Sequence, residues 1–130
     1  MQFMPETAKM YDIDSMSPPE EQIRAAILYI SWLDDFWKER IYDPDERIKF
    51  ILASYNVGLG HVIDATNLAV YLGYSPAKWE NNVAECILLK SDRKYYQSEL
   101  VKHGYCRGEE PYTYVKKILY QYDHYKKVIS

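Results

Sequence analysis

The sequence lacks the features that define several large classes of protein. No apolar stretch is long enough to span a bilayer, and no charged segment followed by an apolar one precedes Pro5 as a secretion signal would. Basic residues are not clustered either. The net charge is −3, and the nearest basic run, Lys116-Lys117, is only two residues long. Binding of nucleic acid through phosphates needs clustered Lys and Arg, so this function is excluded. If the protein is exported, we expect its targeting information to lie outside these residues.

Motifs for metal, nucleotide and serine-nucleophile chemistry are also missing. His61, His103 and His124 are far apart, and no H-E-x-x-H pattern occurs. There is no G-x-S-x-G elbow and no phosphate-binding glycine loop, and Gly58-Leu59-Gly60 is better interpreted as a turn between helices. We therefore expect no metal and no cofactor.

Cysteine is scarce, with only Cys86 and Cys106 in the chain. Two cysteines without a spacing pattern do not identify a redox compartment, and two free thiols are the favoured interpretation over a disulfide. Cys106 follows His103 closely, but nothing in the sequence lowers the pKa of the thiol or supplies a third, orienting group. A cysteine nucleophile is therefore not favoured.

The sequence is rich in tyrosine, with 14 Tyr against three Phe and three Trp. Such rings bury one face while keeping a hydroxyl available, either at the margin of a core or along a groove for a polar ligand. For most of them the core margin is the favoured interpretation. The length of 130 residues, with 48% apolar and 27% charged residues, fits one compact domain.

Helix signals begin with the segment 17–40. It has Ser17 as N-cap, prolines in the first turn and Glu20 three residues on, which completes a capping box. Apolar residues at helical spacing predict its buried face, namely Ile23, Ile27, Ile30, Leu33 and Trp37.

The segment 43–56 repeats these signals. Asp43 is the predicted cap, Pro44 takes the first helical position, Glu46 takes the third, and Gly58 is placed to end the helix. Its predicted buried stripe consists of Ile48, Ile51, Leu52 and Tyr55.

Three more helices are predicted, at 61–72, 75–89 and 111–129. The first is closed by Gly73, and the other two begin near Pro76 and Pro111. Their aligned apolar residues are Trp79, Val83 and Ile87 in 75–89, and Val115, Ile118, Leu119 and Tyr122 in 111–129. The segment 91–110 lacks periodicity and is predicted to be irregular, with one short helical turn or a small hairpin. No segment alternates apolar and polar residues long enough for a sheet, so the fold class is predicted to be all-α.

Several motifs, in order, resemble one enzyme family. They are "MQFMPETA" at 1–8, "ASYNVGLGHVIDA" at 53–65, "SPAKWENNV" at 75–83 and "YYQSELVKHGYCRGEEPYTYVKKIL" at 95–119. The chain resembles the lytic transglycosylases with a goose-type lysozyme-like fold, and within them the membrane-bound lytic murein transglycosylase F group. Each motif alone is weak, but their order and spacing cover essentially the whole chain.

The resemblance implies cleavage of the β-1,4 bond between N-acetylmuramic acid (MurNAc) and N-acetylglucosamine (GlcNAc) in peptidoglycan. The muramoyl C6 hydroxyl attacks C1 and leaves a 1,6-anhydroMurNAc end. One glutamate acts first as general acid and then as base, so a pair of carboxylates is not required. Such an acid needs a pKa raised by apolar surroundings.

The resemblance also implies roles for five residues in binding the glycan. Gln2 and Tyr55 match residues that line the cleft, Tyr55 with its hydroxyl near the catalytic glutamate. Asn56 matches the asparagine that secures the same loop, where a purely structural role is equally favoured. Glu110 and Tyr114 match a cleft-facing acid and the aromatic residue before valine, with a solvated acid and a packed ring as the alternative.

The family's catalytic glutamate belongs to a Glu-Ser pair upstream of the Met-Gln segment. Glu6 occupies a variable position and does not replace it, so we expect no catalytic residue in this chain and an acid upstream of Met1. The expectation is a single partial domain over 1–130 that lacks its first catalytic helix and is inactive alone. Met1 would then not be a natural start.

The resemblance further implies a periplasmic, outer-membrane-associated protein that acts on peptidoglycan glycan strands, with a membrane anchor on the full-length protein. Two alternatives remain open at this point. The chain is a non-catalytic glycan-binding module, or it is a lysozyme-type hydrolase of the same fold.

Overall fold

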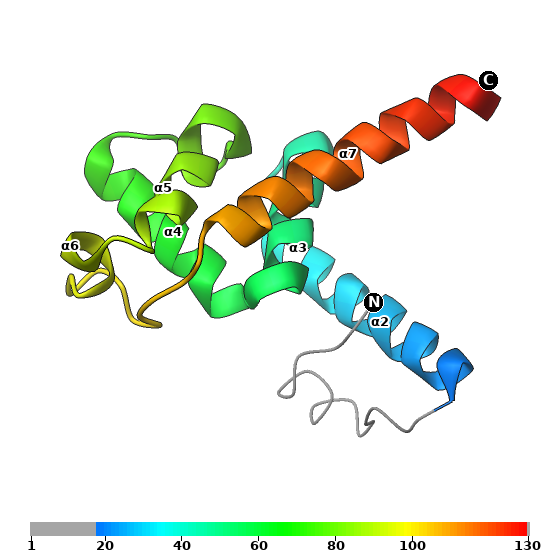
Figure 1. Cartoon of the computed structure of the whole chain (residues 1–130), viewed down its shortest axis with the longest axis horizontal. Coiled ribbons are helices and arrows are strands. Elements are labelled where there is room, and N and C mark those ends of the chain that lie inside the picture. Colours follow the sequence, from blue (N-terminus) through cyan, green and yellow to red (C-terminus); the bar gives the residue numbers. More distant parts are fainter. Residues whose placement is uncertain (1–17, 130) are drawn as a thin grey trace.

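The computed structural model describes residues 18–129, and every regular element within them is helical (Figure 1). The prediction of an all-α fold is confirmed. The elements are α2 (Pro19–Lys38), α3 (Pro44–Val57), α4 (Leu59–Leu72), η1 (Trp79–Val83), α5 (Ala84–Leu89), α6 (Arg93–Tyr96) and α7 (Glu109–Ile129). No helix within the described residues combines the length and apolar character needed to cross a membrane. Ser17 lies outside this range, as do Gln2 and Glu6.

Helix α2 forms where predicted but buries a different face. Its N-cap position is Pro18, so the predicted cap at Ser17 is one residue too early. The buried side chains include Tyr29, Leu33 and Trp37, which repeat every four residues and face α3. Ile23 and Ile27 lie to one side of that stripe and are 58% and 60% exposed, so their predicted burial was wrong. Ile30 is partly buried against the core.

Helices α3 and α4 are bounded by the predicted cap and stop residues, apart from the start of α4. The Asp43 carboxylate accepts a hydrogen bond from the backbone N–H of Asp45, at 2.9 Å, and so caps α3. Gly58 ends α3 with φ at 103°, a conformation that glycine adopts without the clash a Cβ causes. Helix α4 begins at Leu59, two residues before the predicted start, and ends at Gly73 as predicted.

The predicted buried stripe of α3 is confirmed only in part. Ile51 is buried and Leu52 and Tyr55 pack against the core, but Ile48 is 39% exposed. Glu46 holds the third helical position, yet its carboxylate does not complete a capping box. It accepts the backbone N–H of Trp79 at 2.8 Å and pairs with Lys49 at 2.7 Å.

The predicted continuous helix at 75–89 is broken. Glu80 and Asn81 have non-helical backbone angles, with φ of 61° at Asn81, and regular helix resumes only at Ala84 as α5. Asparagine tolerates this left-handed conformation better than most residues. Trp79, Val83 and Ile87 are nevertheless all buried, as predicted.

The last segments differ from the prediction at the start of α7 and at one side chain. The segment 91–108 is irregular apart from the single turn α6, whereas Glu109 and Glu110, which were predicted to be irregular, form the beginning of α7. In α7, Val115 is buried and Ile118 and Leu119 are partly buried, whereas Tyr122 is 58% exposed. Figure 1 shows the reason, because the second half of α7 projects beyond α3 and leaves its inner face uncovered by other described helices.

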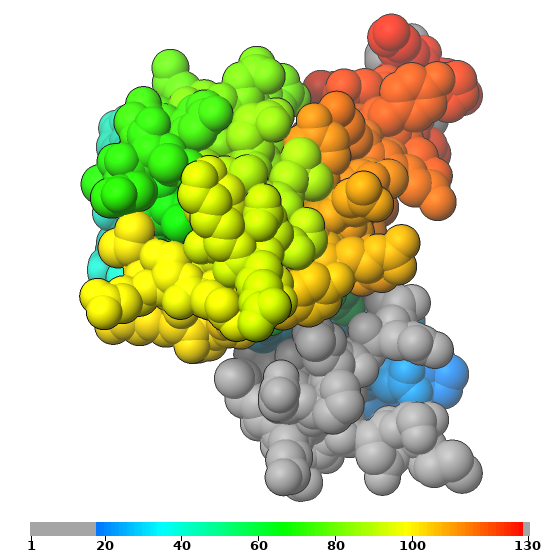
Figure 2. Space-filling view, turned by 60° about the vertical axis from the view of Figure 1, so that its left-hand side comes forward, coloured from blue at the N-terminus to red at the C-terminus, as the bar shows by residue number. Residues whose placement is uncertain are grey.

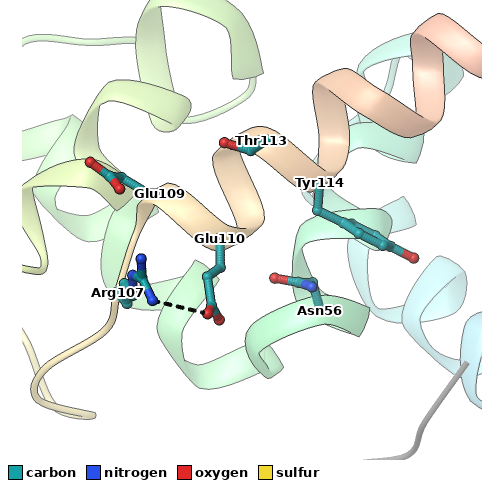
Figure 3. Close-up of a pocket in the computed structure, with 6 residues that line it drawn as sticks. All are labelled: Asn56, Arg107, Glu109, Glu110, Thr113 and Tyr114. Carbon is teal, nitrogen blue, oxygen red and sulfur yellow. Dashed lines mark ion pairs between the residues drawn. The ribbon is translucent and has the colours of Figure 1, made fainter.

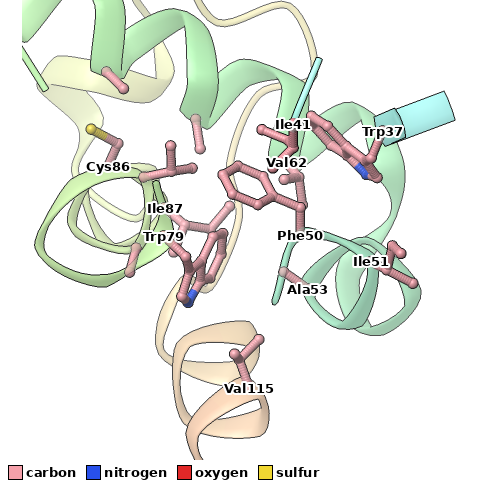
Figure 4. Packing of buried hydrophobic residues seen from close by; sticks show 14 of the residues in the cluster. Trp37, Ile41, Phe50, Ile51, Ala53, Val62, Trp79, Cys86, Ile87 and Val115 are labelled. Carbon is pink, nitrogen blue, oxygen red and sulfur yellow. The ribbon is translucent and has the colours of Figure 1, made fainter. Parts of the chain in front are cut away.

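The core lies where α3, α4, η1 and α5 meet, and side chains of α2 and Val115 of α7 complete it (Figure 4). The ring of Phe50 lies between those of Trp37 and Trp79, with centroid distances of 5.1 and 5.4 Å. The indole N–H of Trp37 donates to the Ser54 hydroxyl at 2.9 Å, so the buried polar groups of both residues are satisfied. This packing fixes the end of α3, from which the candidate site is built.

Candidate functional site

A pocket of about 550 Å³ lies between the end of α3 and the first turns of α7 (Figure 3). Its lining residues are Asn56, Arg107, Glu109, Glu110, Thr113 and Tyr114. Residues about 50 positions apart in the sequence therefore meet in one concavity. Three of the five residues predicted for glycan binding are among them.

Asn56 comes to the pocket because of how α3 ends. Ser54 is fixed by Trp37 and Gly58 turns the chain away, so the last turn of α3 is held in place. The side-chain carbonyl oxygen of Asn56 is buried and has no hydrogen-bond partner within the described residues. An unpaired buried acceptor costs free energy, which a ligand donor would recover. Figure 3 shows the amide facing the Glu110 side of the pocket.

Arg107 and Glu110 come to the pocket because of how α7 begins. Gly108 is buried against α5, where any Cβ would overlap the backbone carbonyl of Ile87. Only glycine permits this close approach. The Arg107 guanidinium lies 3.7 Å from the Glu110 carboxylate, and both side chains are largely exposed. The pair is weakly held, so both charges are accessible to a ligand.

Tyr55 and Tyr114 form the aromatic edge of the site. Burial raises the pKa of both phenols, and for Tyr55 the neighbouring phenols of Tyr114 and Tyr29 raise the pKa further. The rings of Tyr29 and Tyr55 are 6.0 Å apart. Both phenols of the site are therefore neutral hydrogen-bonding groups at physiological pH.

The structure thus places Asn56, Glu110 and Tyr114 on one pocket, with Tyr55 beside it. Gln2 lies outside the described residues. Sequence reasoning did not select the other pocket residues, Arg107, Glu109 and Thr113. The sequence did point to this region, because Arg107-Gly108 and the acids that follow belong to the motif quoted at 95–119.

Sequence reasoning also missed a buried ion pair on the other side of α4. The Lys90 ammonium lies 2.6 Å from the Asp64 carboxylate, and the two side chains are 0% and 1% exposed. Asp64 also accepts the backbone N–H groups of Lys102 and His103, both at 2.9 Å. Lys90 makes a further contact of 2.8 Å with Nδ1 of His61. The sequence offered one signal for this pair, namely that Asp64 is an aspartate within the apolar stretch of α4.

This cluster anchors the irregular segment that leads to α7. Asp64 binds the backbone at 102 and 103, and the carbonyl oxygen of Lys90 accepts the N–H of Cys106 at 3.2 Å. Figure 2 shows the segment, in yellow, lying against α4 and α5, in green. Arg107 follows directly, so the cluster helps to hold one wall of the pocket.

The same cluster predicts a pH dependence of stability. Burial and the Lys90 charge lower the pKa of His61 below its ordinary 6.5. Burial alone would raise the pKa of Asp64, but hydrogen bonds from Lys90, Lys102 and His103 lower it below 3.8. Both groups bind protons more weakly in the folded state, so the free energy of unfolding falls with decreasing pH.

We expect this fall to begin below about pH 6.5, from His61, and to steepen below about pH 4, from Asp64. Urea titrations between pH 8 and pH 5 measure the first part. His61→Gln should flatten the curve there, and His124→Gln, an exposed control on α7, should leave it unchanged. A curve equally steep in the His61 variant would contradict the assignment.

The remaining candidate groups do not form a chemical site. Cys86 and Cys106 are free and buried. Burial raises the pKa of Cys86 to about 11 and that of Cys106 in the same direction, which disfavours the nucleophilic thiolate. Among residues 18–129 no group of three or more His, Cys, Asp and Glu side chains is placed to hold a metal ion.

Comparison with protein families identifies the class. The family described as the transglycosylase SLT domain matches residues 1–74, which is more than half of the chain. The chain therefore belongs to the SLT transglycosylase domain family, whose fold is lysozyme-like and all-α.

Individual relatives are named membrane-bound lytic murein transglycosylase F. The chain is 41% identical to the protein from Haemophilus influenzae over 112 residues, which is 86% of this chain and 22% of that protein. It is 39% identical to the Shewanella loihica protein over 117 residues, or 90% of this chain and 24% of the relative. It is 35% identical to the Desulfosudis oleivorans protein over 127 residues, or 98% and 27%. The chain spans about a quarter of the length of these curated relatives.

Proposed function

We propose that this chain is the greater part of a lytic transglycosylase catalytic domain that cleaves the MurNAc-β-1,4-GlcNAc bond of peptidoglycan. One observation carries the proposal. Asn56 and the pair Glu110 and Tyr114, which come from two separate motifs, line one pocket. Membership of the SLT family and the names of the relatives support the same activity.

The pocket suits a sugar ligand with amide and hydroxyl groups. The unpaired carbonyl oxygen of Asn56 accepts a hydrogen bond, Glu110 accepts others, and Arg107 donates. Tyr55 and Tyr114 offer neutral phenols next to apolar ring faces. The pocket therefore binds and orients the glycan, which is the contribution we assign to these residues.

The reaction needs one group that gives and then takes a proton. The acid protonates the oxygen that leaves with GlcNAc as its bond to C1 breaks. The resulting carboxylate then accepts the proton of the muramoyl C6 hydroxyl while O6 bonds to C1. Water is not consumed, and the product ends in 1,6-anhydroMurNAc.

We propose that this acid lies outside the chain, in a Glu-Ser pair upstream of Met1. The carboxyls of the described pocket do not suit the role. Glu109 and Glu110 are both exposed, and Glu110 pairs with Arg107, whereas a general acid needs apolar surroundings that raise its pKa. The buried Asp64 lies outside this pocket, and its hydrogen bonds lower its pKa and keep it ionised. The isolated chain is then inactive while its glycan pocket is retained.

We further propose the periplasmic face of the outer membrane as the place of action, with a membrane anchor on the full-length protein. The support is the word membrane-bound in the relatives' name and the position of peptidoglycan in the cell envelope.

Glycan binding by the 130-residue chain tests the proposal. We expect the chain to bind purified peptidoglycan fragments without cleaving them, and Asn56→Ala to weaken binding roughly fivefold. That factor corresponds to one hydrogen bond of about 1 kcal/mol. Isothermal titration calorimetry gives both dissociation constants. Gln97→Ala, which removes an exposed side-chain amide away from the pocket, is the matched control. Equal affinities for all three proteins would remove the pocket from the glycan site.

A further inference from the structure

A small pocket lies between η1 and the first half of α7, apart from the candidate site. Its volume is about 100 Å³, well below the roughly 300 Å³ at which pockets for drug-sized ligands begin, so only a small molecule fits. Tyr112 and Lys116 share one face of α7, whereas the candidate site takes Glu110 and Tyr114 from another face. The two pockets share no lining residue. The residues that line the small pocket are Trp79, Glu80, Asn81, Ala84, Tyr112 and Lys116.

The rim of this pocket is the break between η1 and α5. Asn81 has a φ of 61°, a left-handed conformation that costs free energy in a residue with a side chain. The side chain of Asn82 holds the break in place. Its amide donates to the backbone carbonyl of Glu80 at 2.9 Å, and its side-chain oxygen accepts the backbone N–H of Ser75, also at 2.9 Å. The non-helical residues are therefore fixed by contacts on both sides.

The indole N–H of Trp79 is the observation that points to a ligand. The Trp79 side chain is 2% exposed, and buried N–H groups are normally hydrogen-bonded. The backbone N–H of Trp79 is bound by Glu46, but residues 18–129 offer no acceptor to the indole N–H. Figure 4 shows the indole nitrogen directed toward α7, which carries the opposite wall of the pocket. The pocket thus contains a buried donor that a ligand would satisfy.

The ammonium group of Lys116 provides a second donor and a positive charge. It lies 4.4 Å from the centroid of the Tyr112 ring and donates to the Tyr112 hydroxyl at 3.0 Å. This hydrogen bond raises the pKa of Lys116, and the charges of Glu80 and Glu85 raise it to a smaller extent. No carboxylate in the described part of the chain forms an ion pair with this ammonium. Lys116 is therefore a positioned cation without a counter-ion.

Glu80 provides a negative charge on the same pocket. Its side chain is 67% exposed and lies 3.9 Å from the Lys49 ammonium, which has a nearer partner in Glu46 at 2.7 Å. So long and exposed a contact is weak, and the Glu80 carboxylate remains accessible. The pocket can therefore bind an anionic group at its two donors and a cationic group at Glu80. A ligand that carries both charges matches it better than a ligand with either one alone.

We propose that this pocket binds a small zwitterionic amino acid, of the size of glycine or alanine. The carboxylate of the ligand accepts hydrogen bonds from the Trp79 indole and the Lys116 ammonium, and its own ammonium group pairs with Glu80. The volume excludes amino acids with large side chains. The dissociation constant is expected to be millimolar, because so small a ligand makes few contacts. The site is independent of the proposed glycan pocket.

Nuclear magnetic resonance of the 130-residue chain tests the site, because each tryptophan indole N–H gives its own signal. Titration with D-alanine or L-alanine at constant ionic strength should shift the signal of Trp79. The signal of Trp37 should stay in place, because its N–H is bound to Ser54. Trp79→Phe identifies the signal by its loss. Acetate, which lacks the ammonium group, should bind more weakly than alanine.

Exchanges of the two charged residues complete the test. Lys116→Gln should weaken alanine binding roughly tenfold, because a hydrogen bond to a charged group is lost. Lys117→Gln, an exposed neighbour on α7, is the matched control and should bind alanine like the parent chain. Glu80→Gln should weaken binding of alanine but not of acetate, because only alanine carries an ammonium group.

Three results would overturn the proposal. The first is a Trp79 signal that neither enantiomer of alanine moves. The second is an equal affinity for alanine in the Lys116 and Lys117 variants. The third is an affinity for alanine that Glu80→Gln leaves unchanged, which would remove the pairing with the ligand's ammonium group. Glycan binding is measured separately, so each of these results leaves the proposed function standing.

Discussion

Lys90→Met is expected to destabilise the 130-residue chain by about 3 to 5 kcal/mol. The exchange leaves the Asp64 carboxylate buried without its cation, at a site where the two side chains are 1% and 0% exposed. Bringing a charge out of water costs several kcal/mol, and only the ion pair and its hydrogen bonds offset that cost. A loss of this size is a large share of the stability of an ordinary domain.

Urea unfolding followed by circular dichroism measures the effect. Lys117→Met is the matched control, because Lys117 is exposed on α7, and we expect a change below about 0.5 kcal/mol. The double variant Asp64→Asn with Lys90→Met removes both charges and should recover part of the loss. A destabilisation below about 1 kcal/mol for Lys90→Met would contradict the burial of this pair.

The ion pair also shows why the sequence could not predict the whole site. Asp64 and Lys90 are 26 residues apart, on α4 and just after α5, and their meeting depends on how these helices pack. A lysine at the end of a predicted helix is ordinarily solvated. Only the tertiary structure reveals that it is buried and that the pair holds the backbone at 102 and 103.

Helix boundaries were the most predictable part of the fold. Asp43, Gly58 and Gly73 act as the cap and stop residues that their chemistry indicates. The break at Asn81 was not predictable in the same way, because Trp79, Val83 and Ile87 keep helical spacing across it. The backbone N–H of Trp79 is instead bound by Glu46, a contact across 33 residues that local patterns do not encode.

Burial was predicted less well than helix position. Ile23 and Ile27 belong to a helix whose apolar residues cover more than one side, so periodicity did not select the side that packs on α3. Tyr122 has the correct spacing for burial, but its half of α7 extends past α3. In both cases the apolar pattern correctly indicated a helix, but which of its side chains are buried depended on the neighbouring helices.

The candidate site was predicted through the motifs rather than through composition or periodicity. Asn56, Glu110 and Tyr114 were named from separate segments and line one pocket. Arg107 was quoted within a motif but given no role.

The second large effect concerns the reaction itself. We expect the full-length gene product, with whatever sequence precedes Met1, to release fragments from purified sacculi. Exchange of the glutamate in the expected Glu-Ser pair for glutamine should slow release by at least about 100-fold, because it removes both the acid and the base. The 130-residue chain alone should release nothing while still binding glycan. Release by the isolated chain would place the acid within residues 1–130.

The mass of the released fragments tests the central claim most directly. Attack by the muramoyl C6 hydroxyl leaves a 1,6-anhydroMurNAc end, whereas attack by water leaves a reducing end that is heavier by one water molecule. We predict that mass spectrometry of the fragments released by the full-length protein shows the lighter, anhydro ends. Fragments that carry only reducing ends, or no release of fragments at all, would contradict the assignment of this chain to a working lytic transglycosylase.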